Sequence, residues 1–155
     1  GYSRRLRLDL SVNILTNHAY NNNVIKVFGG SQKRPNIHIE DMTDLYIKLL
    51  EIDKKMISGK IFNAGYENQS VNHLASLVKK VIGDDVKIKH LESNDNRSYH
   101  ISSKKIENEL GFKTVKTIED AIKDLKNAFD KKELVNTLND EKYFNIKRMN
   151  SIDLN

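Results

Sequence analysis

The chain has 155 residues, of which 38% are hydrophobic and 30% are charged, and it carries a formal net charge of +5. This length accommodates one domain with its own core. Cysteine is absent, which excludes disulfides, thiol catalysis and cysteine-bound metals and fits a cytoplasmic setting. No apolar run approaches the roughly 20 residues of a membrane-spanning helix, so we expect no membrane partner.

The basic residues are mostly lysines spread along the chain, 20 of them against six arginines. Lysine pairs fall on helix-like segments with acidic residues nearby, which favours solvated helix faces over a nucleic-acid surface. The cluster Arg4-Arg5-x-Arg7 is the exception. A phosphate-facing role and a plain surface role both stay open for it.

The first part of the chain predicts two helices and two short strands. The dense apolar residues of 6–20 predict a mostly buried helix, which the asparagines of 21–23 end. Residues 24–28 predict a strand followed by a turn at Gly29-Gly30, and residues 36–39 predict a second strand. Asp41 is the expected N-cap of the next helix, because apolar residues recur after it at helical spacing.

The rest of the chain predicts three strands and three helices. Strands are expected at residues 60–65, 86–91 and 98–101, and the first of them has the pattern of an edge strand whose sheet the chain does not supply. Helices are expected over residues 71–82, over a short segment capped by Ser102-Ser103, and after the capping box Thr117-x-x-Asp120. Residues 136–155 lack a clear period and predict a peripheral or partly disordered tail. We therefore divide the chain into residues 1–135 and a tail, 136–155.

Two of the six arginines lie in short polar loops between strand-like segments. Arg34 follows the Gly29-Gly30 turn, and Arg97 follows the loop after residue 91. A guanidinium presents a planar fork of donors that matches a pair of phosphate oxygens. Two such forks from distant parts of a chain would suit a diphosphate. The alternative is a salt bridge to Asp41, Asp44 or Asp95.

Five stretches, in order and spacing, resemble the C-terminal half of the NAD-dependent sugar-nucleotide epimerases and dehydratases, which are extended short-chain dehydrogenases/reductases. The resemblance covers residues 1 to about 130. The matching stretches are Arg7-Leu-Asp-Leu-x-Val-Asn13, Val27-Phe-Gly-Gly-x-Gln-x-Arg34-Pro-x-Ile-His-Ile-x-Asp41-Met, Phe62-Asn-Ala-Gly65, Asp95-x-Arg97-Ser-Tyr99 and Lys105-Ile through Leu110-Gly-Phe112.

The resemblance implies an α/β fold class: the C-terminal portion of an extended Rossmann-type fold, with mixed short strands and helices, from which the N-terminal cofactor-binding half is absent. Neither the glycine fingerprint Gly-x-x-Gly-x-x-Gly nor the catalytic Tyr-x-x-x-Lys pair occurs where the family places it. Tyr143 and Lys147 have the Tyr-x-x-x-Lys spacing but lie in the tail. We therefore expect no catalytic residue and no cofactor site in this chain, and NAD or NADP in a full-length protein.

The resemblance also implies the site residues. Arg34 and Arg97 are expected to bind the diphosphate of a nucleotide sugar, Phe28 and Val27 to lie beside the base, and Asn13 and Leu10 to line the pocket from the first helix. Phe28 has a second interpretation as an ordinary core residue. His38 is expected to be structural, because no set of ligands at metal-binding spacing accompanies it.

We thus expect the substrate-binding part of an NAD(P)-dependent sugar-nucleotide epimerase or dehydratase, which anchors the nucleotide diphosphate and is inactive alone. A homodimer of the longer protein stays open. The rival is a non-enzymatic basic domain that binds nucleic acid or a protein partner. A sugar-nucleotide site predicts two arginines in one pocket, whereas a nucleic-acid surface predicts a broad basic stripe.

Overall fold

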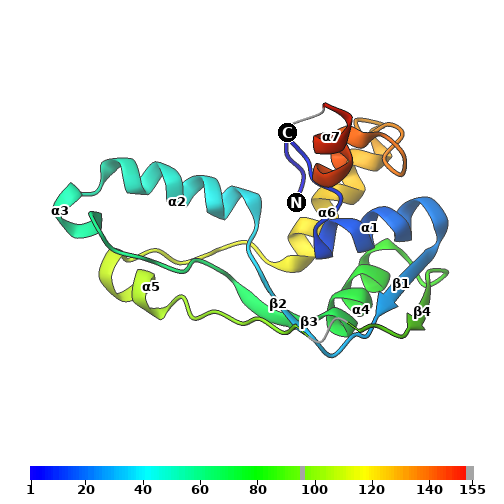
Figure 1. Ribbon diagram of the computed structural model, residues 1–155, viewed down its shortest axis with the longest axis horizontal. Coiled ribbons are helices and arrows are strands. Elements are labelled where there is room, and N and C mark those ends of the chain that lie inside the picture. The colour runs from blue at the N-terminus through cyan, green and yellow to red at the C-terminus, as the bar shows by residue number, and fades with distance from the viewer. Residues whose placement is uncertain (95–96, 153–155) are drawn as a thin grey trace.

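The computed structural model describes residues 1–94 and 97–152 as an elongated α/β molecule with a body and a protruding arm (Figure 1). The body contains the following elements: α1 (Ser11–Asn22), β1 (Val24–Phe28), α4 (Val71–Ile82), β4 (Lys87–Leu91), α6 (Ile118–Asp130), the 3-10 turn η1 (Glu141–Tyr143) and α7 (Asn145–Ser151). The arm contains α2 (Ile39–Glu51), α3 (Lys54–Ile57) and α5 (Lys104–Leu110). Strands β2 (Lys33–Asn36) and β3 (Glu67–Ser70) join the two parts.

The body core lies between a parallel strand pair and three helices. Strands β1 and β4 pair in parallel from Val24↔Lys87 to Phe28↔Leu91. Ile25 and Val27 of β1 are fully buried, and they pack in one cluster with α1, α4 and α6. A parallel pair requires a long crossover connection, and here the connection from β1 to β4 contains helices α2 and α3 of the arm as well as β2, β3 and α4.

Most of the predicted helices are confirmed, as are the strand at 24–28 and the strand expected at 86–91, which forms over Lys87–Leu91. Helix α4 has the expected bounds, with Ser70 as its N-cap and Gly83 as its C-cap. Helix α6 begins with the complete capping box, in which Thr117 accepts from the amide of Asp120 and Asp120 accepts from the amide of Thr117. Helix α5 also forms where expected, but the hydroxyl of Ser103 binds Gly65 instead of capping it.

Helix α1 begins at Ser11, so the prediction of a helix from residue 6 is wrong. The amide of Leu8 donates to the carbonyl of Tyr143 at 2.8 Å. Leu6 and Leu8 are buried in a cluster with Leu125, Phe129 and Tyr143. The apolar density of residues 6–10 therefore reflects an irregular segment buried beneath the tail, because burial alone does not distinguish a helix from an extended segment.

The tail is more ordered than its weak periodicity predicts. Residues 141–151 form η1 and α7, and Tyr143 is 5% exposed. The hydroxyl of Thr137 donates to Asn17 Oδ1 at 2.7 Å, and Asn17 Nδ2 donates to the carbonyl of Thr137 at 3.1 Å, both in the buried interior. These polar contacts, invisible to a hydrophobic period, fix the start of the tail to α1. The domain division at residue 135 stays a prediction.

The start of α2 corrects two further predictions. Strand β2 covers Lys33–Asn36 instead of residues 36–39, and it pairs antiparallel with β3. The N-cap of α2 is His38, whose Nδ1 accepts from the amide of Glu40 at 3.2 Å. Because the helix already begins at Ile39, Asp41 lies in its first turn and does not cap it.

Asp41 instead fastens the arm to α6. Its carboxylate is 1% exposed and accepts hydrogen bonds from the amides of Val115, at 2.9 Å, and Lys116, at 3.1 Å. These two amides belong to the extended segment that returns from α5 to α6. The carboxylate therefore fixes the relative position of α2 and the entry to α6, both of which border the cavity described below.

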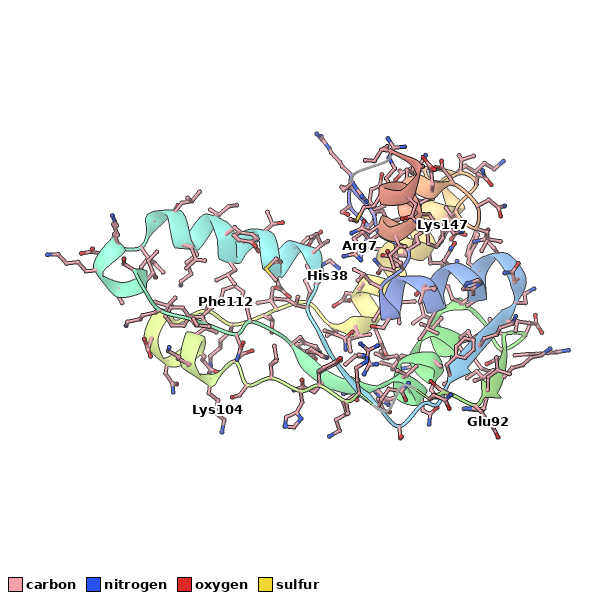
Figure 2. The ribbon with its side chains drawn as sticks, in the orientation of Figure 1. Arg7, His38, Glu92, Lys104, Phe112 and Lys147 are labelled. Carbon is pink, nitrogen blue, oxygen red and sulfur yellow. The ribbon has the colours of Figure 1, made fainter. Side chains whose placement is uncertain are left out.

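Residues 60–65 do not form a strand, contrary to expectation. Phe62 and Ala64 pack into the arm cluster with Leu45 and Phe112, whereas Ile61 is 82% exposed; Figure 2 shows Phe112 within the arm. The side chains therefore alternate as in a strand. Among residues 1–94 and 97–152, however, no neighbouring strand pairs with this segment, because a sheet requires a partner that this part of the chain does not supply.

Residues 98–101 also fail to form a strand. The side chain of Asn68 binds both backbone groups of Ile101, and the amide of Tyr99 donates to the carbonyl of Lys33 at 3.1 Å. Side-chain contacts thus replace a strand ladder. None of the described helices is long and apolar enough to cross a membrane.

We expect Asp41→Ala to lower the free energy of unfolding by about 3 kcal/mol, since each hydrogen bond to a charged group contributes about 1.5–3 kcal/mol. Urea denaturation measures the change. Asp44→Ala, on the exposed side of the same helix, is the control and should change stability by less than about 0.5 kcal/mol. Equal effects of the two substitutions would contradict the role of Asp41.

The capping box of α6 gives a pH dependence. Hydrogen bonds from the hydroxyl and amide of Thr117 hold the pKa of Asp120 below its ordinary value. Such a carboxyl contributes stability above its unfolded pKa, and this contribution is lost as the pH falls through the folded pKa. We expect Asp120→Asn to lower the free energy of unfolding by about 1 kcal/mol at pH 7. We expect this difference between the variant and the native chain to disappear at a pH below about 4. A difference in the free energy of unfolding that is independent of pH in urea titrations would refute this.

Candidate functional site

The first turn of α1 is an open helix N-terminus. Leu10 is the N-cap in an extended conformation, with no side-chain cap and no acidic residue in the first turn. Within the described part of the chain, the amides of Ser11, Val12 and Asn13 donate to no hydrogen-bond acceptor. Unsatisfied amides and the positive end of a helix dipole favour an anion.

This helix end borders a cavity of about 610 Å³ between the body and the start of the arm. The wall combines the first turn of α1, the end of β2, the start of α2 and the entry to α6. Three of the six predicted site residues line the cavity, namely Leu10, Asn13 and Arg34. The charged side chains of the lining besides Arg34 are those of Arg5, Arg7, Asp9 and Lys116, so the lining carries an excess of positive charge.

Several of these cations hold structural contacts. Arg7 Nε lies 2.9 Å from Asp9 Oδ1, and Figure 2 shows Arg7 between α1 and the tail. Partial burial raises the pKa of Asp9, but hydrogen bonds from Arg7 and the amide of Asn145 outweigh this and keep it below its ordinary value. Arg5 donates to the carbonyl of Lys142 and the side chain of Asn145. These contacts join the N-terminal segment to the tail.

Arg34 joins the two predicted arginine segments. Its Nη1 donates to the carbonyl of Arg97 at 2.6 Å and to its neighbour Lys33 at 2.9 Å, and its guanidinium carbon lies 5.1 Å from the centre of the Tyr99 ring. The amide of Lys33 also interacts with the hydroxyl of Ser98 at 2.9 Å. Segments that are distant in sequence therefore meet at Arg34, which lines the cavity, and the cation–π contact orients the guanidinium.

The structure places the two predicted arginines differently. The Arg34 side chain is half-buried and lines the cavity, whereas Arg97 is exposed and only its carbonyl is shown to contact Arg34. The carboxylate of Asp41, proposed as an alternative partner, binds the amides of Val115 and Lys116. Asp95, another alternative partner and part of the matching motif, lies outside the described residues.

The two predicted base-binding residues, Val27 and Phe28, differ in their exposure to solvent. Val27 is fully buried in the body core, so only its backbone could face a ligand. Phe28 is 53% exposed and lines a second hollow of about 550 Å³ with Ile14, Gln32 and Lys89. The interpretation of Phe28 as a core residue is therefore wrong. The two hollows share Ser11, so the exposed ring of Phe28 lies in the hollow next to the open N-terminus of α1.

Gln32 was missed by sequence reasoning, although it holds the turn between Phe28 and Arg34. Its Oε1 accepts from the amide of Gly30, and its Nε2 donates to the carbonyl of Phe28 at 2.6 Å. Gly30 adopts φ +119°, and a Cβ there would lie 2.1 Å from Asn72 Oδ1. The pattern Gly-Gly-x-Gln could have indicated a turn whose own side chain satisfies its backbone.

His38 is structural, as expected. It is 3% exposed, Nδ1 accepts from the amide of Glu40, and Nε2 lies 3.0 Å from Asp124 Oδ2. Because Nδ1 accepts, the hydrogen lies on Nε2 and is donated to the carboxylate. Figure 2 shows His38 at the start of α2. No group of three or more potential metal ligands occurs among residues 1–94 and 97–152.

The comparisons with known proteins concern the fold. No family model matches the chain. Similar solved structures include a UDP-glucuronic acid 4-epimerase mutant from Bacillus cereus with a substrate analogue and NAD (TM-score 0.72, 21% identity, 84% of this chain and 42% of that chain). A dTDP-glucose 4,6-dehydratase from Bacillus anthracis in complex with NAD is also similar (TM-score 0.65, 16% identity, 94% of this chain and 44% of that chain). So is an L-threonine dehydrogenase from Phytophthora infestans (TM-score 0.71, 11% identity, 84% of this chain and 45% of that chain).

The predicted fold class is confirmed: the chain is a mixed α/β structure that matches the C-terminal portions of epimerase and dehydratase folds. It spans less than half the length of these solved chains. At these identities the likeness shows the fold, and the threonine dehydrogenase shows that the fold occurs with a substrate that is not a nucleotide sugar.

We expect Gly30→Ala to destabilise the protein more than Gly59→Ala. Both glycines have positive φ, but a Cβ at Gly59 meets open space, whereas one at Gly30 would collide with Asn72. A left-handed residue at φ +71° costs about 1 kcal/mol, whereas φ +119° at Gly30 lies in a region that other residues rarely adopt and costs about 1–3 kcal/mol. The Asn72 side chain is exposed and can rotate away, so it adds little. Thermal unfolding of both variants measures this, and equal losses would contradict the greater backbone strain at Gly30.

Proposed function

We propose that this chain is the substrate-binding portion of an NAD(P)-dependent sugar-nucleotide epimerase or dehydratase, working in the cytoplasm. The diphosphate binds at the first turn of α1 and Arg34, and the base packs against Leu10 and Phe28. The observation that carries the proposal is that Arg34 and the open helix end line the same cavity. We assign no catalytic residue to the chain.

The electrostatics of the cavity support a diphosphate. Amides of the α1 first turn can donate to one phosphate, while the positive charge of the Arg34 guanidinium, whose Nη1 also donates to the carbonyls of Lys33 and Arg97, attracts the other. Arg97 contributes through its carbonyl, which accepts a hydrogen bond from the Arg34 guanidinium at 2.6 Å. A remote group anchored in this way provides binding energy that orients the reacting sugar.

The exposed apolar residues support a nucleoside. Leu10 is 45% exposed and Phe28 is 53% exposed, and they come from the start of α1 and the end of β1 beside the same helix end. An exposed aromatic face stacks on any base at about 1–3 kcal/mol. The choice of base then rests on groups near Phe28, among which Lys26 and Lys89 line the same hollow.

The residues of this chain do not fit an NAD site. A dinucleotide-binding turn joins a strand directly to a helix through three glycines. Here β1 is followed by Gly29-Gly30, but the chain continues into β2. We therefore assign NAD or NADP to a longer protein that contains this chain, and we derive no redox step from the residues present. A homodimer of that longer protein remains a proposal without a surface assigned to it.

A nucleic-acid surface is not proposed, because many lysines are paired with acids. Examples are Lys60 with Glu109, Lys80 with Glu119 and Lys126 with Asp130, at 2.7–2.9 Å. Such pairs, which occur in both the arm and the body, break up a continuous basic stripe, which is the electrostatic footprint that nucleic acids require.

Isothermal calorimetry with UDP-, GDP-, dTDP- and CDP-sugars tests the proposal. We expect saturable binding of one nucleotide class, weakened about 10- to 100-fold by Arg34→Ala, because a charge-assisted hydrogen bond contributes about 1.5–3 kcal/mol. Arg97→Ala should weaken binding less, since its side chain is exposed. The control is Arg148→Ala, an arginine of the tail that is paired with Glu141, which should leave affinity unchanged.

The same titration separates the alternatives. Equal losses in the Arg34 and Arg148 variants would show that overall charge, and not the site, drives binding. Binding of a nucleotide sugar that is unaffected by Arg34→Ala and Phe28→Ala would remove the assigned site. NAD serves as a negative control, and saturable NAD binding would contradict the assignment of the cofactor site to another part of a longer protein.

A further inference from the structure

The segment that carries Arg97 and Tyr99 is held by side chains. From residue 97 to residue 103 no strand or helix is formed. Ser98 binds the amide of Lys33 at one end, and Ser103 Oγ contacts the amide and the carbonyl of Gly65, at 2.9 and 3.0 Å, at the other. Between these ends, the backbone of Ile101 interacts with a single side chain, that of Asn68.

Asn68 binds both backbone groups of Ile101. Its Oδ1 accepts from the Ile101 amide at 2.8 Å, and its Nδ2 donates to the Ile101 carbonyl at 2.9 Å. A side-chain amide has the same donor and acceptor as a peptide group. Asn68 therefore supplies the pair of hydrogen bonds that a neighbouring strand would supply, in a part-buried place where unpaired backbone groups are costly.

The position of Asn68 links it to Arg34. In the β2–β3 register, Asn68 faces Pro35 and Gln69 faces Arg34. Tyr99 lies two residues before Ile101, with its ring beneath the Arg34 guanidinium, and the carbonyl of Arg97 accepts a hydrogen bond from the same guanidinium. A path thus runs from β3 through the hydrogen bonds of Asn68 to Ile101, along the backbone to Tyr99, and through the ring of Tyr99 to Arg34.

We infer that Asn68 is a positioning residue: its side-chain amide holds the Arg97–Tyr99 segment against Arg34 and thereby sets the orientation of the guanidinium in the cavity. The consequence for ligand affinity rests on the proposed function; the consequence for the segment itself does not. Asn68 is not among the residues that line the cavity, so its effect on a ligand is transmitted through Tyr99 and Arg34.

Hydrogen exchange of Asn68→Ala tests the holding role. The amide of Ile101 donates to Asn68 and that of Tyr99 to Lys33. We expect both amides to exchange at least about tenfold faster in the variant, while the buried core of β1 and α4 is unchanged. Asn68→Asp keeps the acceptor but loses the donor, so we expect a smaller increase. Asn139→Ala, which removes an exposed asparagine contact in the tail, is the matched control.

Limited digestion with trypsin gives an independent readout. Arg97 is exposed and is followed by Ser98, whereas Arg34 is followed by Pro35, which blocks cleavage by this protease. We expect cleavage after Arg97 to accelerate in Asn68→Ala and not in Asn139→Ala. Unchanged exchange at Tyr99 and Ile101 together with unchanged cleavage would overturn the inference, whatever the nucleotide titrations show.

Ligand affinity separates a positioning role from a merely structural one. At a temperature well below unfolding, Asn68→Ala should weaken nucleotide-sugar binding about tenfold. If Asn68 acts through Tyr99, the loss caused by Tyr99→Leu should be smaller in the Asn68→Ala background than in the native chain. Additive losses would overturn the transmission through Tyr99. Faster exchange in a chain that binds no nucleotide sugar at all would confirm the holding role and refute the proposed function instead.

Discussion

The candidate site depends on one guanidinium that joins two segments 63 residues apart in sequence. Arg34 comes from a short strand that follows a glycine turn, and Arg97 comes from a loop that side chains hold in place. The hydrogen bond from Arg34 to the Arg97 carbonyl and its cation–π contact with Tyr99 join the polar loop to β2. The contact therefore orients a cation that lines the cavity.

The first turn of α1 forms another part of the cavity wall, and it lacks the side-chain cap and the acidic residue that commonly stabilise a helix N-terminus. A leucine occupies the N-cap and no acidic residue follows in the first turn, although both substitutions would stabilise a helix by about 1 kcal/mol. The other long helices are capped by side chains: α2 by His38, α4 by Ser70 and α6 by Thr117. Proteins give up local stability at functional sites, and here the uncapped helix end lies beside Arg34.

Sequence reasoning predicts the periodic elements well and the contacts poorly. The amphipathic spacing of apolar residues in α4 and α6 and the capping box of α6 are local patterns, so they can be recognised from neighbouring residues. The buried role of Asp41 and the replacement of a strand by Asn68 depend on partners about 30 to 75 residues away. The site shows the same division: Arg34 stands out in the sequence as a candidate phosphate ligand, while Gln32, which holds the turn before it, and Asn68, which we propose positions it, are ordinary polar residues in sequence. The predicted strand at 60–65 shows the correct alternation, but a strand also needs a neighbour.

The most direct test of the central claim is a titration of the isotopically labelled chain with nucleoside diphosphates, followed by nuclear magnetic resonance. The account predicts that the backbone amides of Ser11, Val12 and Asn13 and the side-chain Nε of Arg34 shift together and saturate at one concentration, with Phe28 shifting only when a base is attached to the diphosphate. Shifts confined to the surface lysines, or saturation of the Arg34 signal without any change in the first turn of α1, would contradict a shared diphosphate site.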